Sequence, residues 1–425
     1  MSDLPAGWST HRLDEIADIR LGRQRSPKNH LGPQMRSYLR AANVGWAGLK
    51  LDDVKSMNFS DSEMGIYQLR PGDVLLSEAS GSPGEVGKPA LWSGELDECA
   101  FQNTLIRIRP HDVDSLFLLH YFRYVALTGG FTGQARGVGI HHLGRARIAR
   151  WLTPVPPPDE QRRIVDILED HLSRLDAAHS SLTSAHLRLS VLHKSVLMSL
   201  IPDVSVYPAH WSRSTVSDAG KVTLGRQRHP DWHNGANMHP YLRVANVFED
   251  HIDLRDVKEM HWPDDSFERF RLKPGDVLLN EGQSPEFLGR PAMYRGEPID
   301  IAFTNTLIRF QAHDHVLPEF ALLVFRRHMH AGRFARESRI TTNIAHLSAS
   351  RLKPIEFPIP PLDEQKQLAG LAEHQLGDAA RLGDQVGLLK LRNRVLRRAL
   401  LSAAFSGRLT GRTTDMEIVE EMAGV

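Results

Sequence analysis

The chain has 425 residues, of which 52 are basic and 51 acidic, and it contains a single cysteine, Cys99. This length is too great for one compact core and predicts about two to four domains. The near-zero net charge excludes a protein that holds nucleic acid through overall positive charge alone, and one cysteine excludes an internal disulfide. The first residues lack a signal-peptide pattern, and no apolar run approaches the roughly 18 residues that span a membrane. We therefore expect a soluble cytoplasmic protein.

The sequence contains a long internal repeat. An offset of 203 residues relates Trp8 to Trp211, residues 21–25 (LGRQR) to 224–228, and residues 71–76 (PGDVLL) to 274–279. The offset becomes 202 where residues 103–107 (NTLIR) match 305–309, and 204 where residues 159–161 (DEQ) match 363–365. So little drift over so many matches indicates a duplicated domain with a few loop changes, because the period is far longer than that of a solenoid repeat.

Each half consists of a mixed region followed by one long helix. Short apolar runs predict strands at residues 74–76, 105–108, 277–279 and 307–310, and three- and four-residue apolar spacing predicts helices at 116–127 and 319–330. The fold class that follows is α+β, with two mixed domains in a pseudo-twofold arrangement. The predicted boundaries are 1–155 and 203–358 for the mixed domains, 156–202 and 359–412 for the helices, and 413–425 for a tail.

The long helices should run from about 159 to 200, closed by Pro202, and from about 363 to 405, closed by Gly407. Both carry a seven-residue apolar repeat, and large residues in one helix align with small ones in the other. We expect an antiparallel coiled coil that separates the mixed domains, with Asn393 fixing its register. The alternative is that each helix packs on its own domain. The second helix contains Gly370, Gly377, Gly383 and Gly387, which either allow a partner to approach closely or make this helix less regular.

Motifs for catalysis are missing from the sequence. The Gly-rich run at residues 81–88 is followed by Pro89 and is no phosphate-binding loop, and neither half carries a methyltransferase motif. His179, His186 and His193 recur every seven residues, which places them about 10 Å apart along a helix, too far to share one ion. We predict a binding protein with no catalytic residues and no metal site.

Basic and polar loops recur at equivalent places in the two halves. Arginine is suited to guanine edges, and asparagine and glutamine to adenine edges, so these loops favour DNA binding, although each could equally be a solvated loop. The candidate DNA-binding residues are Arg23, Gln24, Arg25, Lys28, Arg136, His141, His142 and Arg145 in the first half, and Arg226, Gln227, Arg228, His229, Arg333, Arg336, Arg339, Thr342 and Asn343 in the second.

The order of these motifs, found twice, resembles the specificity subunit of type I restriction–modification systems over about residues 5 to 412. The motifs that carry the resemblance are Trp8, Leu21-Gly22, the PGDVLL and NTLIR stretches, the DEQ helix starts and the closing FSGRLT at 405–410. The resemblance implies two target recognition domains that read the halves of a split, asymmetric DNA sequence, and helices that set the gap between them.

The resemblance also implies partners. Two methyltransferase subunits would dock on the helices and methylate adenine N6 with S-adenosylmethionine, and two translocating nuclease subunits would join them, so this chain itself binds no cofactor. Glu160, Gln161, Glu364 and Gln365 are expected to cap the helices and contact the methyltransferase. The alternatives are a standalone sequence-specific DNA-binding protein or orphan reader, a nuclease with an unrecognised site, and a purely structural scaffold.

Overall fold

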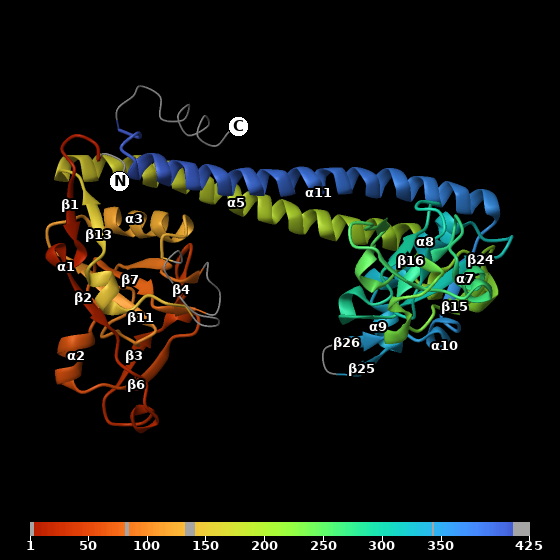
Figure 1. The fold of residues 1–425 in the computed structure, drawn as a ribbon, viewed down its shortest axis with the longest axis horizontal. Helices are drawn as coiled ribbons and strands as arrows, with labels where there is room; N and C mark the ends of the chain where they lie inside the picture. Colours follow the sequence, from red (N-terminus) through yellow and green to blue (C-terminus); the bar gives the residue numbers. More distant parts are fainter. Residues whose placement is uncertain (1–3, 81–84, 132–140, 342–343, 411–425) are drawn as a thin grey trace. The chain divides into compact units, whose positions relative to one another are not determined.

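The structure is a computed structural model that describes residues 4–80, 85–131, 141–341 and 344–410. The chain divides into two compact units, residues 1–182 with 388–425 (unit 1) and residues 183–387 (unit 2). Each unit holds one mixed domain and part of each long helix, α5 (Pro158–Leu200) and α11 (Leu362–Phe405) (Figure 1). Both helices match the predicted ranges closely and run unbroken from one unit into the other.

The domain of unit 1 is built on a four-stranded antiparallel sheet in the order β2–β11–β7–β9. Its side chains alternate: Val74 and Leu76 enter the core under α3, and Leu75 enters a second core on the opposite face. A three-stranded sheet, β10–β3–β6, and a pair, β1–β13, flank it. The elements are β1 (Ser9–Arg12), α1 (Leu13–Ile16), β2 (Ala17–Leu21), β3 (Met35–Leu39), β4 (Val44–Gly45), β5 (Gly48–Leu49), β6 (Lys55–Asn58), α2 (Asp61–Tyr67), β7 (Asp73–Ser77), β8 (Ala79–Ser80), β9 (Pro89–Trp92), β10 (Ala100–Phe101), β11 (Leu105–Pro110), α3 (Ser115–Leu127), β12 (His141–His142), α4 (Arg145–Ala149) and β13 (Leu152–Val155).

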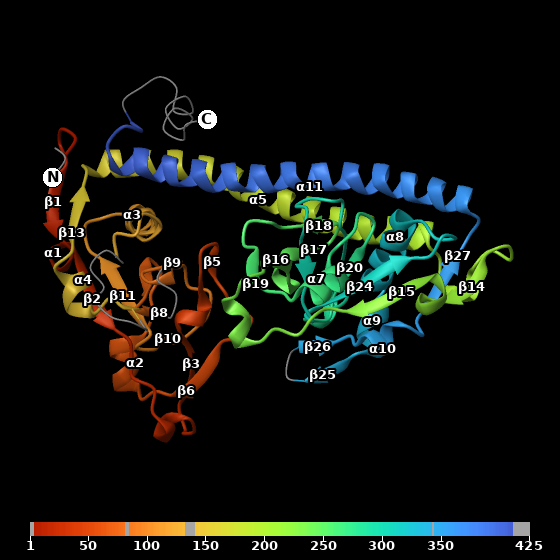
Figure 2. The ribbon, with the colours of Figure 1, turned by 45° about the vertical axis from the view of Figure 1, so that its right-hand side comes forward.

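The domain of unit 2 repeats the topology of these three sheets, as β15–β24–β20–β22, β19–β16–β23 and β14–β27 (Figure 2). In the described residues it differs in one small sheet, β21–β26–β25, which corresponds to the pair β8–β12 of unit 1. The register repeats as well: Ile106 pairs with Leu76 in unit 1, and Ile308 with Leu279 in unit 2. The predicted α+β class, strands and short helices are confirmed. The elements are β14 (Ser212–Thr215), α6 (Val216–Ala219), β15 (Gly220–Leu224), β16 (Met238–Leu242), β17 (Val247–Phe248), β18 (His251–Ile252), β19 (Lys258–His261), α7 (Asp264–Phe270), β20 (Val277–Asn280), β21 (Gly282–Gln283), β22 (Pro291–Met293), β23 (Ala302–Phe303), β24 (Leu307–Ala312), α8 (Pro318–His330), α9 (Arg333–Glu337), β25 (Arg339–Thr341), β26 (Ile344–His346), α10 (Ala349–Leu352) and β27 (Glu356–Ile359).

In unit 1 the two long helices pack against each other and against the domain. The Asn393 side chain is buried and its Nδ2 donates a hydrogen bond to the Leu175 carbonyl at 2.8 Å, as expected for a polar residue in the seam. Farther along α11, Leu400 lies in the same core as Leu168, earlier in α5, so the pairing is antiparallel. Phe405 closes this core, with its ring 5.4 Å from that of Tyr121. The helices therefore form an antiparallel pair and also pack on a mixed domain, so both arrangements that the sequence allowed are present.

In unit 2 the end of α5 and the start of α11 share one core with α8, through Leu197 and Leu376 among others. The glycines of α11 do not interrupt it. A methyl group added at Gly370, Gly383 or Gly387 would meet no atom within 4 Å in the described part of the chain. The surface beside these glycines is therefore open while the helix stays continuous. Of the two explanations for the glycines, this favours close approach of a partner over a less regular helix. Despite their length, α5 and α11 are too polar to cross a membrane, and no other helix in the described ranges is suitable.

Candidate nucleic-acid interface

The arginine shortly after β2 in unit 1 and the one shortly after β15 in unit 2 make the same kind of contact inside their domains. Arg23 donates to the Asn58 carbonyl at 2.6 Å and forms an ion pair of 2.7 Å with Glu63. Arg226 donates to the His261 carbonyl at 2.8 Å and stacks on the Trp232 ring at 3.8 Å. Burial lowers the pKa of Arg226. These guanidinium groups hold the loop to the neighbouring sheet, and their predicted contact with DNA bases stays a prediction.

The residues just after these arginines are exposed. In unit 1 they are Gln24, Arg25 and Lys28, and in unit 2 they are Gln227, Arg228 and His229. Arg25 donates from Nε to the His30 ring at 3.1 Å, and His229 lies 3.2 Å from an Asp231 carboxylate oxygen. The partly buried arginine therefore anchors each loop while its neighbours present donors and acceptors to solvent, as a base-reading loop requires.

A second pair of equivalent loops is joined to the domains by short strands. In unit 1, β12 pairs with β8, and the exposed His142 ring lies 3.1 Å from Glu78. In unit 2, β26 pairs with β21, and the His346 ring lies 3.2 Å from Glu281. His346 was not among the predicted DNA-binding residues. The sequence held one signal for it, because its partner Glu281 is the repeat equivalent of Glu78, the partner of the predicted His142. Arg136, Thr342 and Asn343 lie outside the described residues, as do the side chains of His141 and Arg339.

The remaining candidate arginines divide into exposed and internal residues. Arg145 is exposed and makes a long 3.5 Å contact with the Ile19 carbonyl, and Arg336 is exposed with a 3.3 Å contact to the Ala331 carbonyl. Arg333 instead donates to Glu356 at 2.9 Å and pairs with Glu337 at 2.5 Å, and its side chain is 19% exposed. Two carboxylates therefore already neutralise Arg333 at the start of α9, and its contact with DNA stays a prediction.

The glutamine of each DEQ stretch is buried at the junction between helix and domain. Gln161 accepts a hydrogen bond from the Asp114 amide at 2.9 Å and donates to the Pro156 carbonyl at 2.9 Å. Gln365 accepts from the Leu317 amide at 2.8 Å and donates to the carbonyls of His315 and Pro360, both at 2.9 Å. Because each is at most 3% exposed, a partner cannot reach these side chains, and their predicted role is corrected.

The glutamates beside them are partly exposed. The Glu160 carboxylate lies 3.6 Å from Arg163 and its side chain is 22% exposed. Glu364 accepts from the Trp211 indole at 3.0 Å and the His210 ring at 2.9 Å. Trp211 is the repeat equivalent of Trp8. The glutamate of the second DEQ stretch therefore binds one of the two tryptophans that correspond in the repeat. Contact between these glutamates and a partner stays a prediction.

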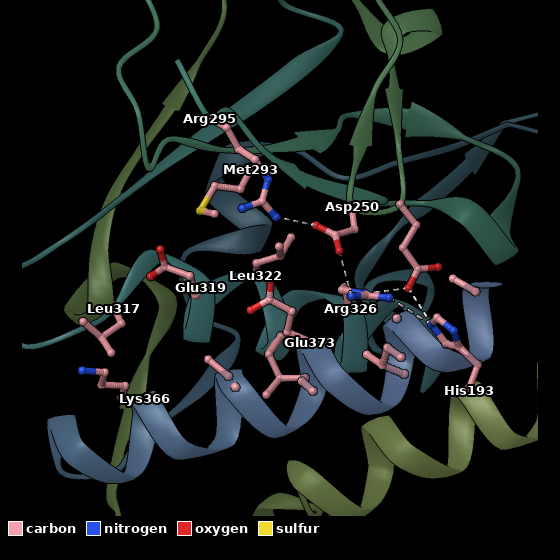
Figure 3. Close-up of a pocket in the computed structure, with 18 residues that line it drawn as sticks. His193, Asp250, Met293, Arg295, Leu317, Glu319, Leu322, Arg326, Lys366 and Glu373 are labelled. Carbon is pink, nitrogen blue, oxygen red and sulfur yellow. Dashed lines mark hydrogen bonds and ion pairs between the residues drawn. The ribbon is translucent and has the colours of Figure 1, made fainter. Parts of the chain in front are cut away.

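Unit 2 also contains a groove of about 900 Å³ between α8 and the start of α11 (Figure 3). Its floor is apolar and includes Leu322, Leu376 and the small residues of α11, and charged side chains such as Lys366 and Glu373 lie at its rim. His193 and Arg326 lie at one end. This groove could not be predicted from the sequence, because it depends on the distance between α8 and the glycines and alanines of α11.

Comparison with known proteins identifies the family. A model of the type I restriction modification DNA specificity domain matches residues 5–183 and 234–371. The chain belongs to this family.

Several type I specificity subunits are similar to the chain over nearly its whole length. The EcoKI specificity subunit of Escherichia coli strain K12 is 22% identical over 96% of this chain and 90% of its own length. The StySPI specificity subunit of Salmonella potsdam is 20% identical over the same shares. A solved structure from a study of assembly and conformational transition of a type I restriction–modification system matches with a TM-score of 0.76 and 19% identity, covering 96% of this chain and all of that one. The HsdS subunit from Thermoanaerobacter tengcongensis matches with a TM-score of 0.53 at 21% identity, over 96% of this chain and 98% of that one.

Proposed function

We propose that this specificity subunit reads a split, asymmetric DNA sequence, with one half-site for the domain of each unit. The observation that carries the proposal is the repetition of one topology and register in both units, with exposed basic loops at equivalent places. Two joined readers bind a split site far better than one, because the second contact becomes intramolecular. The unbroken helices α5 and α11 link the readers and would set the gap.

The asymmetry of the target follows from loop differences between the domains. After the partly buried arginine, the first domain continues through Pro27 and Lys28, and the second through His229 and Trp232. The groups offered to base edges therefore differ: an exposed lysine in one loop, a histidine in the other. A palindromic target would need the same donors and acceptors on both sides.

The helices are the proposed docking surface for two methyltransferase subunits, one for each unit. Large apolar side chains are exposed on both: Leu388, Leu389 and Leu391 in unit 1, and Leu187, Val191, Leu192, Leu371 and Leu382 in unit 2. Exposed apolar residues clustered on one element are typical of a protein interface. The partners would supply adenine-N6 methylation and bind S-adenosylmethionine, nuclease subunits would join the assembly, and the complex would act in the cytoplasm.

Co-purification with a methyltransferase subunit tests this proposal. We expect a complex with one copy of this chain and two of the methyltransferase. Changing Leu388 and Leu391 to serine should remove one methyltransferase, and changing Leu187 and Val191 should remove the other. The control is Leu31→Ser, an equally apolar residue that is 84% exposed outside the helices. If all these variants keep both partners, or if the chain alone methylates or cleaves DNA, the proposal is wrong.

A further inference from the structure

Three potential metal ligands meet in unit 2, each from a different element. His193 comes from α5, Glu249 from the turn between β17 and β18, and His330 from the end of α8. The Nε2 atoms of His193 and His330 each lie 2.9 Å from a different oxygen of the Glu249 carboxylate. The three ligand atoms all lie within 4.8 Å of one another. Two imidazoles and a carboxylate form a common set of protein ligands for zinc.

The internal repeat shows that the fold does not require this cluster. The positions equivalent to His193, Glu249 and His330 in unit 1 are Arg397, Trp46 and Leu127, none of which is a usual metal ligand. The first domain therefore folds with the same topology without such a set. At all three positions unit 2 has a residue that can bind a metal where unit 1 has one that usually does not. These positions are far apart in the sequence, and the fold brings them together.

The surroundings of Glu249 orient its carboxylate and keep it charged. Arg326 donates from Nε to Glu249 at 2.9 Å, and its Nη1 lies 3.3 Å from Asp250, which offsets the positive charge of Arg326 (Figure 3). Its Nη2 lies 3.3 Å from Nε2 of His193, a contact that an ion bound at this nitrogen would have to displace. Outer hydrogen bonds of this kind are usual around metal-binding carboxylates.

An ion can reach the cluster. The side chains of His193, Glu249 and His330 are 22%, 21% and 27% exposed. They border a hollow of about 320 Å³ between α5 and α11, into which His186 and Lys194 also face. Lys194 places a further positive charge nearby, which repels a metal cation. The affinity for the ion must therefore come from direct coordination by the three side chains and not from long-range electrostatic attraction.

We propose that His193, Glu249 and His330 bind one divalent transition-metal ion of the zinc class, which ties α5 to the recognition domain of unit 2. Ligand atoms about 2.1 Å from a tetrahedral ion lie about 3.4 Å apart. The two 2.9 Å hydrogen bonds would therefore lengthen slightly, and the widest separation in the set, which is within 4.8 Å, would close toward this value. To bind the ion through Nε2, each neutral imidazole would carry its single proton on Nδ1 instead of Nε2, so the two hydrogen bonds to Glu249 would be replaced by bonds to the ion. This site revises the sequence-based expectation of no metal site, which considered only histidines along one helix.

The test is titration of the full chain with Zn²⁺, and with Co²⁺ as a spectroscopic probe, in competition with a chelator. We expect one saturable equivalent, a cobalt spectrum typical of mixed nitrogen and oxygen ligands, and a higher unfolding temperature with metal. His193→Arg and His330→Leu introduce the residues of the first half and should weaken binding by at least about tenfold, because even outer-shell changes cost that much. His193→Gln and His330→Gln give a second pair of variants of similar size.

The control is His179→Ala, an exposed histidine on the same helix, which should bind metal like the wild type. Circular dichroism without metal checks that each variant is folded. Absence of a saturable equivalent in the wild type would overturn the proposal, as would equal affinity in folded His193 and His330 variants and the His179 control.

Discussion

The buried glutamines at the helix junctions provide a sharp test of how each reader is fixed to its helix. Gln161 accepts a hydrogen bond from the amide of Asp114, whose side chain caps the start of α3. Gln365 accepts one from the amide of Leu317, which occupies the N-cap position of α8. Each glutamine therefore ties the first turn of a long helix to the first turn of a domain helix. Replacing either with alanine leaves a buried amide without its acceptor.

The expected cost follows from the number of bonds lost. A buried amide without a partner costs about 1–3 kcal/mol, and a lost acceptor contact adds about 1 kcal/mol. Gln161→Ala loses the contacts with Asp114 and Pro156 and should reduce the unfolding free energy of unit 1 by about 2–4 kcal/mol. Gln365→Ala loses one further bond, to His315, and should cost unit 2 about 1 kcal/mol more.

Amide hydrogen exchange measured by mass spectrometry is the assay, because it reports each unit separately. Gln161→Ala should speed exchange at Asp114 and the start of α3 while the start of α8 stays protected, and Gln365→Ala should do the reverse. The exposed neighbours Arg162→Ala and Lys366→Ala are controls and should change stability by no more than about 0.5 kcal/mol. Unchanged protection at Asp114 and Leu317 in the glutamine variants would refute the reasoning.

Three further predictions concern stability and reactivity. Gly383→Ala and Gly387→Ala should each stabilise the chain by about 1 kcal/mol in urea unfolding, because the space around them is open and alanine favours the helix; a loss of stability would show a hidden close contact. Burial lowers the pKa of His328 to about 4 from 6.5, so its contribution to stability is present above pH 6.5 and is lost as pH falls toward 4, by up to about 3 kcal/mol. His328→Gln should flatten the pH dependence of the urea midpoint in this window, and parallel curves for wild type and variant would contradict the assignment. Burial raises the pKa of Cys99 to about 12, so a thiol reagent should label it only on unfolding, and rapid labelling of the native chain would show that the core around Cys99 opens.

The fold could be predicted well because its signals are local and occur twice. A continuous apolar run such as Val74, Leu75 and Leu76 predicts a strand buried on both faces, and the same run in the second half repeats the information. The start and end of α5 and α11 follow from proline, acidic residues and glycine. The buried Asn393 could be placed because a seven-residue pattern assigns it to the seam.

The candidate site was harder to predict because exposure depends on contacts between distant residues. Arg23 and Arg25 are two positions apart, yet one is held by Asn58 and Glu63 and the other is exposed. Nothing in a single sequence distinguishes them, since the acceptor lies 35 residues away. The cluster of His193, Glu249 and His330 was missed for the same reason, because its members come from three elements.

The central claim is that one chain reads two separate half-sites with two similar but unequal domains. The most direct measurement is a map of methylated adenines across a genome in cells that express this chain with its methyltransferase partner. The account predicts a single asymmetric motif in two parts, separated by a gap of fixed length. A continuous motif, a palindrome or a gap of variable length would contradict it.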